Sequence, residues 1–269
     1  KNYTRLDGAQ WDSEGNLWLL NAGTVPNQLI CLDAEGKWHG FPLKLDGSQY
    51  VLPTPTGLLL DKKNPRYKWF SAARHNTRLF LMDDNGTPFD SSDDRIKGRN
   101  KWVTQNDAVF MPDFIFSISQ NREGRIWLGT EAGVAIIDTI DFFASDKIYY
   151  PEVEENGISS SLQTQFVNAL CEDADGHMWV GTQALGLYML SADGSQVLAH
   201  YTTDNSSMPS NTVLSIAIDE SGAVYVGTGD GLVCYDANAD PESLQGGSST
   251  SEELDMEIGR ASCRERVLQ

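Results

Sequence analysis

Residues 170–191 decide the fold and read L-C-E-D-A-D-G-H-M-W-V-G-T-Q-A-L-G-L-Y-M-L-S. The same pattern recurs twice: residues 118–138 read I-S-Q-N-R-E-G-R-I-W-L-G-T-E-A-G-V-A-I-I-D, and residues 216–236 read I-A-I-D-E-S-G-A-V-Y-V-G-T-G-D-G-L-V-C-Y-D. Degenerate copies lie at residues 11–23 and 58–72. Five copies of one motif indicate a repeat architecture.

The spacing of the copies identifies the kind of repeat. Successive aromatic anchors of the motif are 51, 58, 52 and 46 residues apart. A four-stranded propeller blade takes roughly 40–50 residues. The sequence therefore predicts an all-β propeller with five four-stranded blades, forming part of a seven-bladed ring. The anchors are Trp18, Trp69, Trp127, Trp179 and Tyr225.

Each part of the motif has a mechanical interpretation. Alternating apolar and polar residues before the turn predict a strand. Asp-x-x-Gly then predicts a hairpin turn, with Asp capping it and Gly adopting positive φ. In the following strand the aromatic ring is expected to lie between neighbouring blades, and the first Gly to admit a close backbone. A second Gly opens the third strand. The remaining repeat residues are Gly129, Thr130, Gly133, Gly181, Thr182, Gly186, Gly227, Thr228 and Gly231.

Composition excludes some functions. The chain has 20 Lys and Arg residues against 38 Asp and Glu residues, a net charge of −18. Such a surface repels phosphate backbones, so we expect no nucleic-acid partner. It suits solubility, cation binding or a basic partner. No run of about 18 apolar residues is present to span a membrane.

Specific stretches carry a family resemblance. The pattern W-[VL]-G-T-x-x-G-L resembles the two-component regulator propeller repeat, which builds periplasmic sensor regions of Bacteroidetes hybrid histidine kinases. Other stretches are similar to the PorZ-like propeller proteins of the type IX secretion system. These stretches include G-N-L-W-L-L-N-A-G (residues 15–23), N-G-T-P-F-D-S-S-D-D-R (residues 85–95) and H-Y-T-T-D-N-S-S-M-P-S-N-T-V-L-S-I-A-I-D (residues 200–219).

The resemblance implies a non-enzymatic recognition or assembly module outside the cytoplasm. On the PorZ-like interpretation it acts at the cell surface, with protein partners, glycan or lipopolysaccharide as ligands. The alternative is the ligand-sensing propeller of a hybrid two-component system, and a less favoured one is a propeller lyase or glycosidase. A sorting-like β domain downstream would favour the first interpretation, and a transmembrane helix with a kinase the second.

Composition also predicts the domain boundaries. Residues 1–237 are assigned to propeller blades that begin partway through the ring. Residues 238–256 are small, polar and acidic, as in a linker. Residues 257–269 include E-I-G-R-A-S-C-R-E-R-V, which resembles a translated sequencing adapter, and we expect this tail to be non-native and to lie outside the fold. The alternative is a basic tail that binds a partner.

One acidic insertion is a candidate calcium site. Residues 83–94 read D-D-N-G-T-P-F-D-S-S-D-D. Carboxylate and amide oxygens around a Gly turn suit Ca²⁺, although the register is not that of an EF-hand. The alternative is an exposed acidic loop that binds nothing. The predicted ligands are Asp83, Asn85, Asp90 and Asp93.

No catalytic constellation is recognised, so we expect no enzyme and no other cofactor. The four histidines are not at metal-ligand spacing, there is no G-x-S-x-G elbow, and the glycines of residues 227–231 follow the repeat rather than a phosphate loop. The cysteines lack C-x-x-C spacing, and Cys31 and Cys234 are expected to be buried.

Loop aromatic residues are candidates for recognition, because propellers present loops around a central channel. Exposed rings could stack on sugars or anchor a protein partner. The alternative is that each ring packs locally. The candidates are Trp38, Tyr50, Trp102, Phe110, Tyr149 and Tyr150.

Overall fold

The structure is a computed structural model that describes residues 6–21, 27–45, 48–49, 55–72, 79–138, 142–155, 158–159, 161–235 and 264–268. Within these ranges the regular structure is β-strand, apart from a single 3₁₀ turn, η2 (Ser161–Thr164). The prediction of an all-β propeller is confirmed. Blade count in the whole ring stays a prediction.

The strands form five successive antiparallel sheets, called the first to fifth blades. The first and second blades are β1 (Leu6–Trp11), β2 (Leu17–Asn21), β3 (Asn27–Leu32), β4 (Trp38–Pro42), and β7 (Pro55–Leu60), β8 (Tyr67–Ala72), β9 (Leu79–Asp83), β10 (Arg95–Arg99). The third to fifth are β13 (Ile115–Gln120), β14 (Ile126–Thr130), β15 (Gly133–Ile137); β18 (Val167–Glu172), β19 (Met178–Thr182), β20 (Leu187–Leu190), β21 (Val197–Tyr201); and β22 (Val213–Ile218), β23 (Val224–Thr228), β24 (Gly231–Tyr235), β25 (Arg264–Leu268).

The third blade departs from the predicted four strands. It has three strands. In place of a fourth strand, Tyr149 forms an isolated antiparallel bridge with Ile136 of β15. Short two-stranded sheets connect the blades. They are β5 (Lys44–Leu45) with β6 (Ser48–Gln49), β11 (Trp102–Val103) with β12 (Val109–Phe110), and β16 (Glu154–Glu155) with β17 (Ile158–Ser159).

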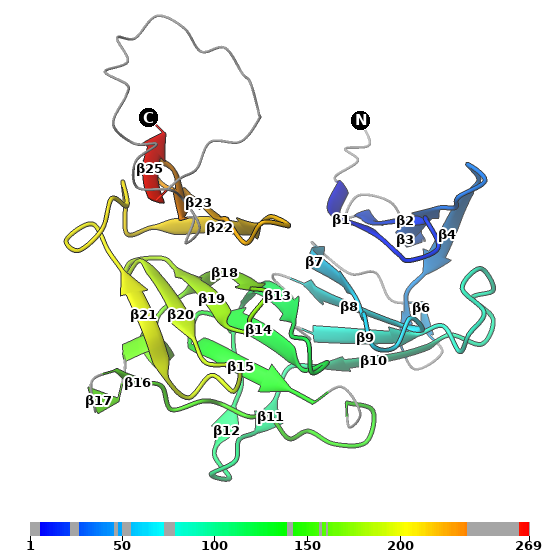
Figure 1. The fold of residues 1–269 in the computed structure, drawn as a ribbon. Coiled ribbons are helices and arrows are strands. Elements are labelled where there is room, and N and C mark those ends of the chain that lie inside the picture. Colours follow the sequence, from blue (N-terminus) through cyan, green and yellow to red (C-terminus); the bar gives the residue numbers. More distant parts are fainter. Residues whose placement is uncertain are drawn as a thin grey trace, which may run out of the picture.

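The blades lie side by side around an open centre (Figure 1). The first strand of each blade is innermost, so β1, β7, β13, β18 and β22 face that centre, and β1 and β22 flank the gap in the ring. The Asp-x-x-Gly turns connect the first and second strands of the blades. The face of the ring that carries them is called the turn face below.

The core lies between neighbouring blades. One cluster joins Trp18 and Leu20 of the first blade to Phe70 and Phe80 of the second, and similar clusters lie between the later blades. The Trp anchors are at most 6% exposed, whereas Tyr225 of the fifth blade is 37% exposed. Burial of an anchor therefore depends on the blade that follows it. Middle strands such as β8, β9, β14 and β19 are sandwiched on both faces and buried nearly throughout.

The Asp of the turn also holds the aromatic anchor. In the fourth blade, Asp173 Oδ1 accepts the backbone N–H groups of Asp175 and His177, and Asp173 Oδ2 accepts indole Nε1–H of Trp179 at 3.0 Å. Burial raises the pKa of Asp173, but these hydrogen bonds outweigh it and leave the pKa below its ordinary value. The Asp thus caps the turn and fixes the ring, a second role that the sequence interpretation did not include.

The first Gly of the motif admits a neighbouring blade, as expected. A Cβ at Gly129 would lie 2.6 Å from the carbonyl oxygen of Val167 in β18, and one at Gly181 would strike the Val213 side chain of β22. The Thr beside it closes the next turn: Thr130 Oγ1 donates to the Gly133 carbonyl at 2.9 Å.

The end of the chain contributes a strand to the fifth blade. Strand β25, from the tail expected to lie outside the fold, pairs antiparallel with β24, with Leu232 opposite Leu268 and Val233 opposite Val267. Without β25, the edge of β24 would present unpaired backbone N–H and C=O groups, and any extended segment can pair with such an edge. The pairing therefore needs no specific side-chain contacts. The predicted linker, residues 238–256, lies outside the described residues.

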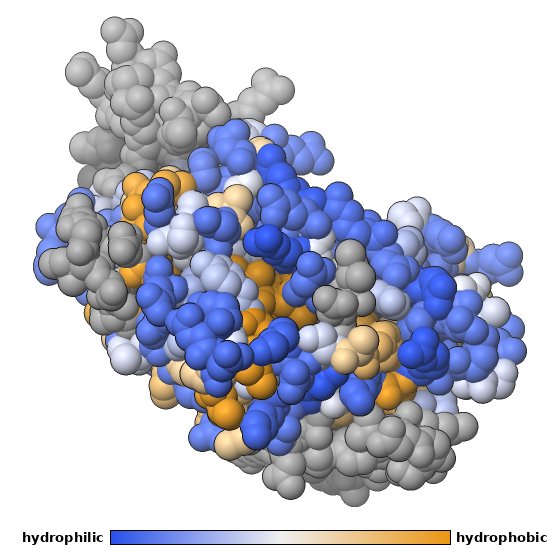
Figure 2. Space-filling model, turned by 90° about the horizontal axis from the view of Figure 1, so that it is seen from below, coloured by the Kyte–Doolittle hydropathy of each residue, from blue (hydrophilic) through white to orange (hydrophobic). Residues whose placement is uncertain are grey.

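The outer surface reflects the acidic composition. Viewed from the side of β11 and β12, it is mostly hydrophilic, with hydrophobic residues gathered near its middle (Figure 2). No helix among the described residues is long and apolar enough to cross a membrane.

Candidate binding pocket between the first two blades

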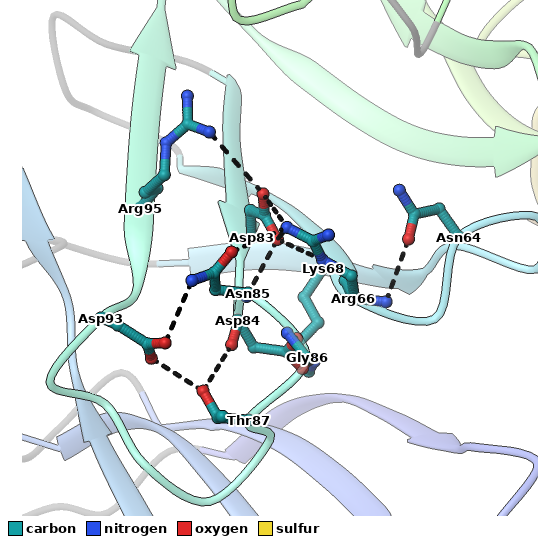
Figure 3. A network of polar contacts seen from close by, with 10 residues as sticks. All are labelled: Asn64, Arg66, Lys68, Asp83, Asp84, Asn85, Gly86, Thr87, Asp93 and Arg95. Carbon is teal, nitrogen blue, oxygen red and sulfur yellow. Dashed lines mark hydrogen bonds and ion pairs between the residues drawn. The ribbon is translucent and has the colours of Figure 1, made fainter.

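Of the predicted calcium ligands, Asp83 ends β9 and the other three lie in the loop between β9 and β10. Figure 3 shows Asp83, Asn85 and Asp93. Asp83 is buried and paired with Arg66, whose Nε and Nη2 donate to its two carboxylate oxygens at 2.9 Å each. Asn85 accepts from Arg66 and donates to Asp93 Oδ2 at 3.1 Å. Asp90 caps the backbone N–H of Ser92 instead.

Three of the four residues therefore join one network, but an arginine takes the place that a cation would need. Of the described residues, no three His, Cys, Asp or Glu side chains are grouped to hold a metal ion. The calcium prediction gains no support from this arrangement. It stays a prediction, which a calcium titration of thermal unfolding would reject if the midpoint did not rise.

The same loop ties the second blade to the first. The Phe89 ring stacks on the His39 ring of β4, with ring centroids 4.2 Å apart. His39 Nε2 in turn lies 2.7 Å from Asp33 Oδ2. The insertion is thus a clasp between blades as well as an acidic loop.

Beneath this clasp lies a pocket of about 380 Å³ on the turn face, called the inter-blade pocket. A volume of this size is typical of small-molecule sites. One wall is formed by residues 10–14 and Trp18 of the first blade, and the other by residues 60–62 and neighbours in the second. Gly86 and Pro88 of the clasp complete it.

A buried ion pair forms one wall of the pocket. Lys68 Nζ donates to Asp84 Oδ2 at 2.6 Å, and both side chains are 3% exposed. The ammonium group also lies 4.5 Å from the centroid of the Trp18 ring, within cation–π range. Asp84 Oδ1 accepts the backbone N–H of Gly86, so its lone pairs are further satisfied. Sequence reasoning missed this pair, although a lysine inside the apolar strand Tyr67–Ala72 was a usable signal, because Lys is rarely buried unless paired.

A second carboxyl group near the pair has an unusual pKa. Burial raises the pKa of Asp94 to about 7, and the negative charge of Asp84 adds to the effect. Perturbed ionisable groups are typical of functional sites, although structural ion pairs produce them too.

The loop aromatic candidates do not converge on the pocket. Trp102 and Phe110 are buried, and Phe110 packs against the Tyr150 ring with centroids 4.9 Å apart. Tyr150 also donates its hydroxyl to the carbonyl of Ala132. Trp38 and Tyr149 are exposed, so they alone among the described candidates present rings to solvent. Tyr50 lies outside the described residues.

Two of the histidines contact the carboxylates that cap turns. His177 Nδ1 lies 3.1 Å from Asp173 Oδ2, the carboxylate that caps its own turn, and His39 contacts Asp33 in the corresponding way. Cys31 and Cys234 are buried free thiols, as expected, and Cys171 is partly buried.

The repeat pattern and the five sheets define the class of protein. The sequence profile described as "Two component regulator propeller" matches residues 110–132 and 161–184. These matches fall on the third and fourth blades. The chain is a β-propeller that carries two-component regulator propeller repeats in its third and fourth blades.

Solved structures place it more closely. It resembles PorZ, a surface component of the type IX secretion system of Porphyromonas gingivalis, with 27% identity and a TM-score of 0.74 over 85% of this chain and 31% of PorZ. It is also similar to the extracellular domain of a putative hybrid two-component system of B. thetaiotaomicron, with 20% identity and a TM-score of 0.60 over 100% of this chain and 29% of the other. The chain therefore spans about a third of the length of either protein.

Enzymes share the fold as well. Virginiamycin B lyase from Staphylococcus aureus matches with 13% identity and a TM-score of 0.55, over 87% of this chain and 68% of the lyase. At that identity the likeness concerns the fold alone. A comparison with curated proteins finds no match.

Proposed function

We propose that the chain is a non-enzymatic recognition or scaffold module that acts outside the cytoplasm, in a PorZ-like role in type IX secretion at the cell surface. The observation that carries the proposal is the likeness to PorZ at 27% identity across 85% of the chain. Its ligands would be protein partners or glycan, including lipopolysaccharide.

The use of the repeat residues supports a scaffold role. The Asp, Trp, Gly and Thr residues of the motif are engaged in turns and blade contacts. They are therefore committed to the fold, and differences between blades, such as the loop of residues 84–94 and the inter-blade pocket, are where recognition would reside.

Deletion of the gene in its source bacterium tests the role. Cargo proteins of the type IX system should accumulate in the periplasm and disappear from the cell surface, and a plasmid copy should restore them. Protease treatment of intact cells should digest the tagged protein if it lies at the surface. Normal cargo secretion in the deletion strain would reject the PorZ-like role.

A second candidate is the ligand-sensing propeller of a hybrid two-component system, favoured by the match to such a domain over the whole chain. It predicts normal cargo secretion and loss of a transcriptional response in the same deletion strain. The third candidate, a lyase or glycosidase, rests on a shared fold and would require turnover of a streptogramin or a glycan by the purified chain.

A further inference from the structure

Two neighbouring blade interfaces share a polar bridge on the turn face. Gln120, at the end of β13, accepts the backbone N–H of Lys62 at 2.6 Å and donates from Nε2 to Asp61 Oδ1 at 2.7 Å. Glu172, at the end of β18, accepts the backbone N–H of Arg122 at 2.8 Å. In both cases an oxygen from one blade satisfies the N–H that follows the capping Asp or Asn of the preceding blade.

This bridge is missing between the fourth and fifth blades, where Ile218 precedes Asp219, and also between the first and second blades, where a pocket adjoins the unbridged position. Gln120 and Glu172 each stand immediately before the capping residue of their own blade, and the corresponding residue of the second blade is Leu60, which precedes Asp61. The leucine side chain has no hydrogen-bond acceptor. The N–H that it would have to satisfy belongs to Ser13, which follows Asp12, and no described residue accepts from it. Ser13, Asp12 and Leu60 all line the inter-blade pocket.

The unbridged position offers a donor and an acceptor side by side. The donor is the backbone N–H of Ser13. The acceptor is Asp12 Oδ1, which takes the N–H groups of Glu14 and Asn16 at 2.9 Å each. Its counterpart Asp61 Oδ1 takes two backbone N–H groups and the Gln120 amide as well, so a third donor fits on this oxygen.

The wider pocket restricts the ligand further. It is much larger than a single carboxamide, and Trp11 at its rim is 67% exposed. Its lining carries charged side chains of both signs, the acidic Asp12, Glu14, Asp61 and Asp84 and the basic Lys62, Arg66 and Lys68. An anion would also approach against the net charge of −18. A neutral group that both donates and accepts hydrogen bonds is the best match.

We propose that the inter-blade pocket binds a neutral pyranose sugar. Its hydroxyl groups would take the place that Gln120 and Glu172 fill elsewhere, accepting from Ser13 N–H and donating to Asp12 Oδ1. The apolar face of the ring would meet the exposed indole of Trp11. This inference rests on the proposed recognition function and assigns a ligand class to this pocket.

The test uses the whole chain, labelled with ¹⁵N, and methyl glycosides of glucose, galactose and mannose as probes. At least one probe should shift the NMR signals of the Ser13 amide and the Trp11 indole at millimolar concentration. Trp11→Ala should weaken binding about tenfold, the effect expected from losing a ring contact. Leu60→Gln should rebuild the missing bridge, raise the melting temperature and abolish binding.

Ile218→Gln is the matched control, because Ile218 holds the same place before Asp219 in the fifth blade. It should leave binding unchanged. The proposal is overturned if no probe shifts these signals, if Leu60→Gln still binds, or if glucuronate binds as tightly as the neutral sugars. Preferential binding of a glutamine-containing tripeptide would assign the pocket to a protein partner instead. A negative result in this titration leaves the cargo-secretion test untouched, so the two proposals fail separately.

Discussion

Asp173 Oδ2 accepts the indole N–H of Trp179 at 3.0 Å, and the same bond joins Asp12 to Trp18 and Asp61 to Trp69. The third blade breaks the series, because its capping residue is Asn121. Among the described residues, neither Asn121 Nδ2 nor Trp127 Nε1 has a hydrogen-bond partner, and both are buried. Two donors thus face a place where the other blades supply a carboxylate.

Replacing this asparagine should stabilise the protein. In Asn121→Asp the carboxylate can cap the turn and accept from Trp127 Nε1, which removes a buried unsatisfied donor. We expect a gain of about 1–2 kcal/mol in the free energy of unfolding, measured by urea denaturation at neutral pH. Asp173→Asn is the reciprocal control and should lose a similar amount. Equal stability of Asn121→Asp and the parent chain would contradict the role assigned to the carboxylate.

The loss of stability on replacing the first motif glycine by alanine should depend on the blade in which the glycine lies. In Gly129→Ala the new Cβ meets the backbone of Val167 in the next blade, which cannot move aside cheaply. We expect a loss of about 2–3 kcal/mol, seen as a lower urea midpoint. Gly227→Ala is matched in position but meets closely only the flexible Ser215 side chain of its own blade, so it should cost about 1 kcal/mol or less. Equal losses would show that close approach between blades is not the cause.

Some of these contacts were predictable from the sequence and others were not. Repetition at a constant period predicted the fold, and the positions of Trp127 and Gly129 in the repeat predicted their place between blades. The hydrogen bond from Asp to Trp could also have been predicted, because the Asp stands six positions before the Trp in both pairs, Asp12 with Trp18 and Asp173 with Trp179. The ion pair between Arg66 and Asp83, seventeen positions apart, was not foreseen among the predicted calcium ligands. Such pairing across a sheet depends on register and cannot be taken from the local sequence.

Breaking the ion pair at the pocket by removing its lysine should destabilise the fold strongly. Lys68→Met leaves Asp84 buried without its cation, and we expect a loss of about 3–5 kcal/mol. Adding Asp84→Asn should recover much of that loss, because the amide keeps an acceptor for Gly86 N–H and carries no charge. Urea denaturation of the two variants measures the difference. As a control, the exposed Lys62→Met should change stability by about 0.5 kcal/mol or less. A double variant no more stable than Lys68→Met would argue against an uncompensated charge.

Asp94 should make stability depend on pH in an unusual direction. Its pKa is about 7 in the folded chain, because of burial and the charge of Asp84, against an ordinary value near 3.8. Between these values the folded state holds a proton that the unfolded state has released, so stability falls as pH rises from about 4 to about 7. Asp94→Asn cannot titrate and should flatten this part of the profile, measured as the urea midpoint at several pH values. Asp90→Asn is the control: hydrogen bonds from Ser92 lower the pKa of Asp90, so its removal should leave the fall between pH 4 and 7 in place. If the profile of Asp94→Asn fell as steeply as that of the parent chain, another group would have to carry the effect.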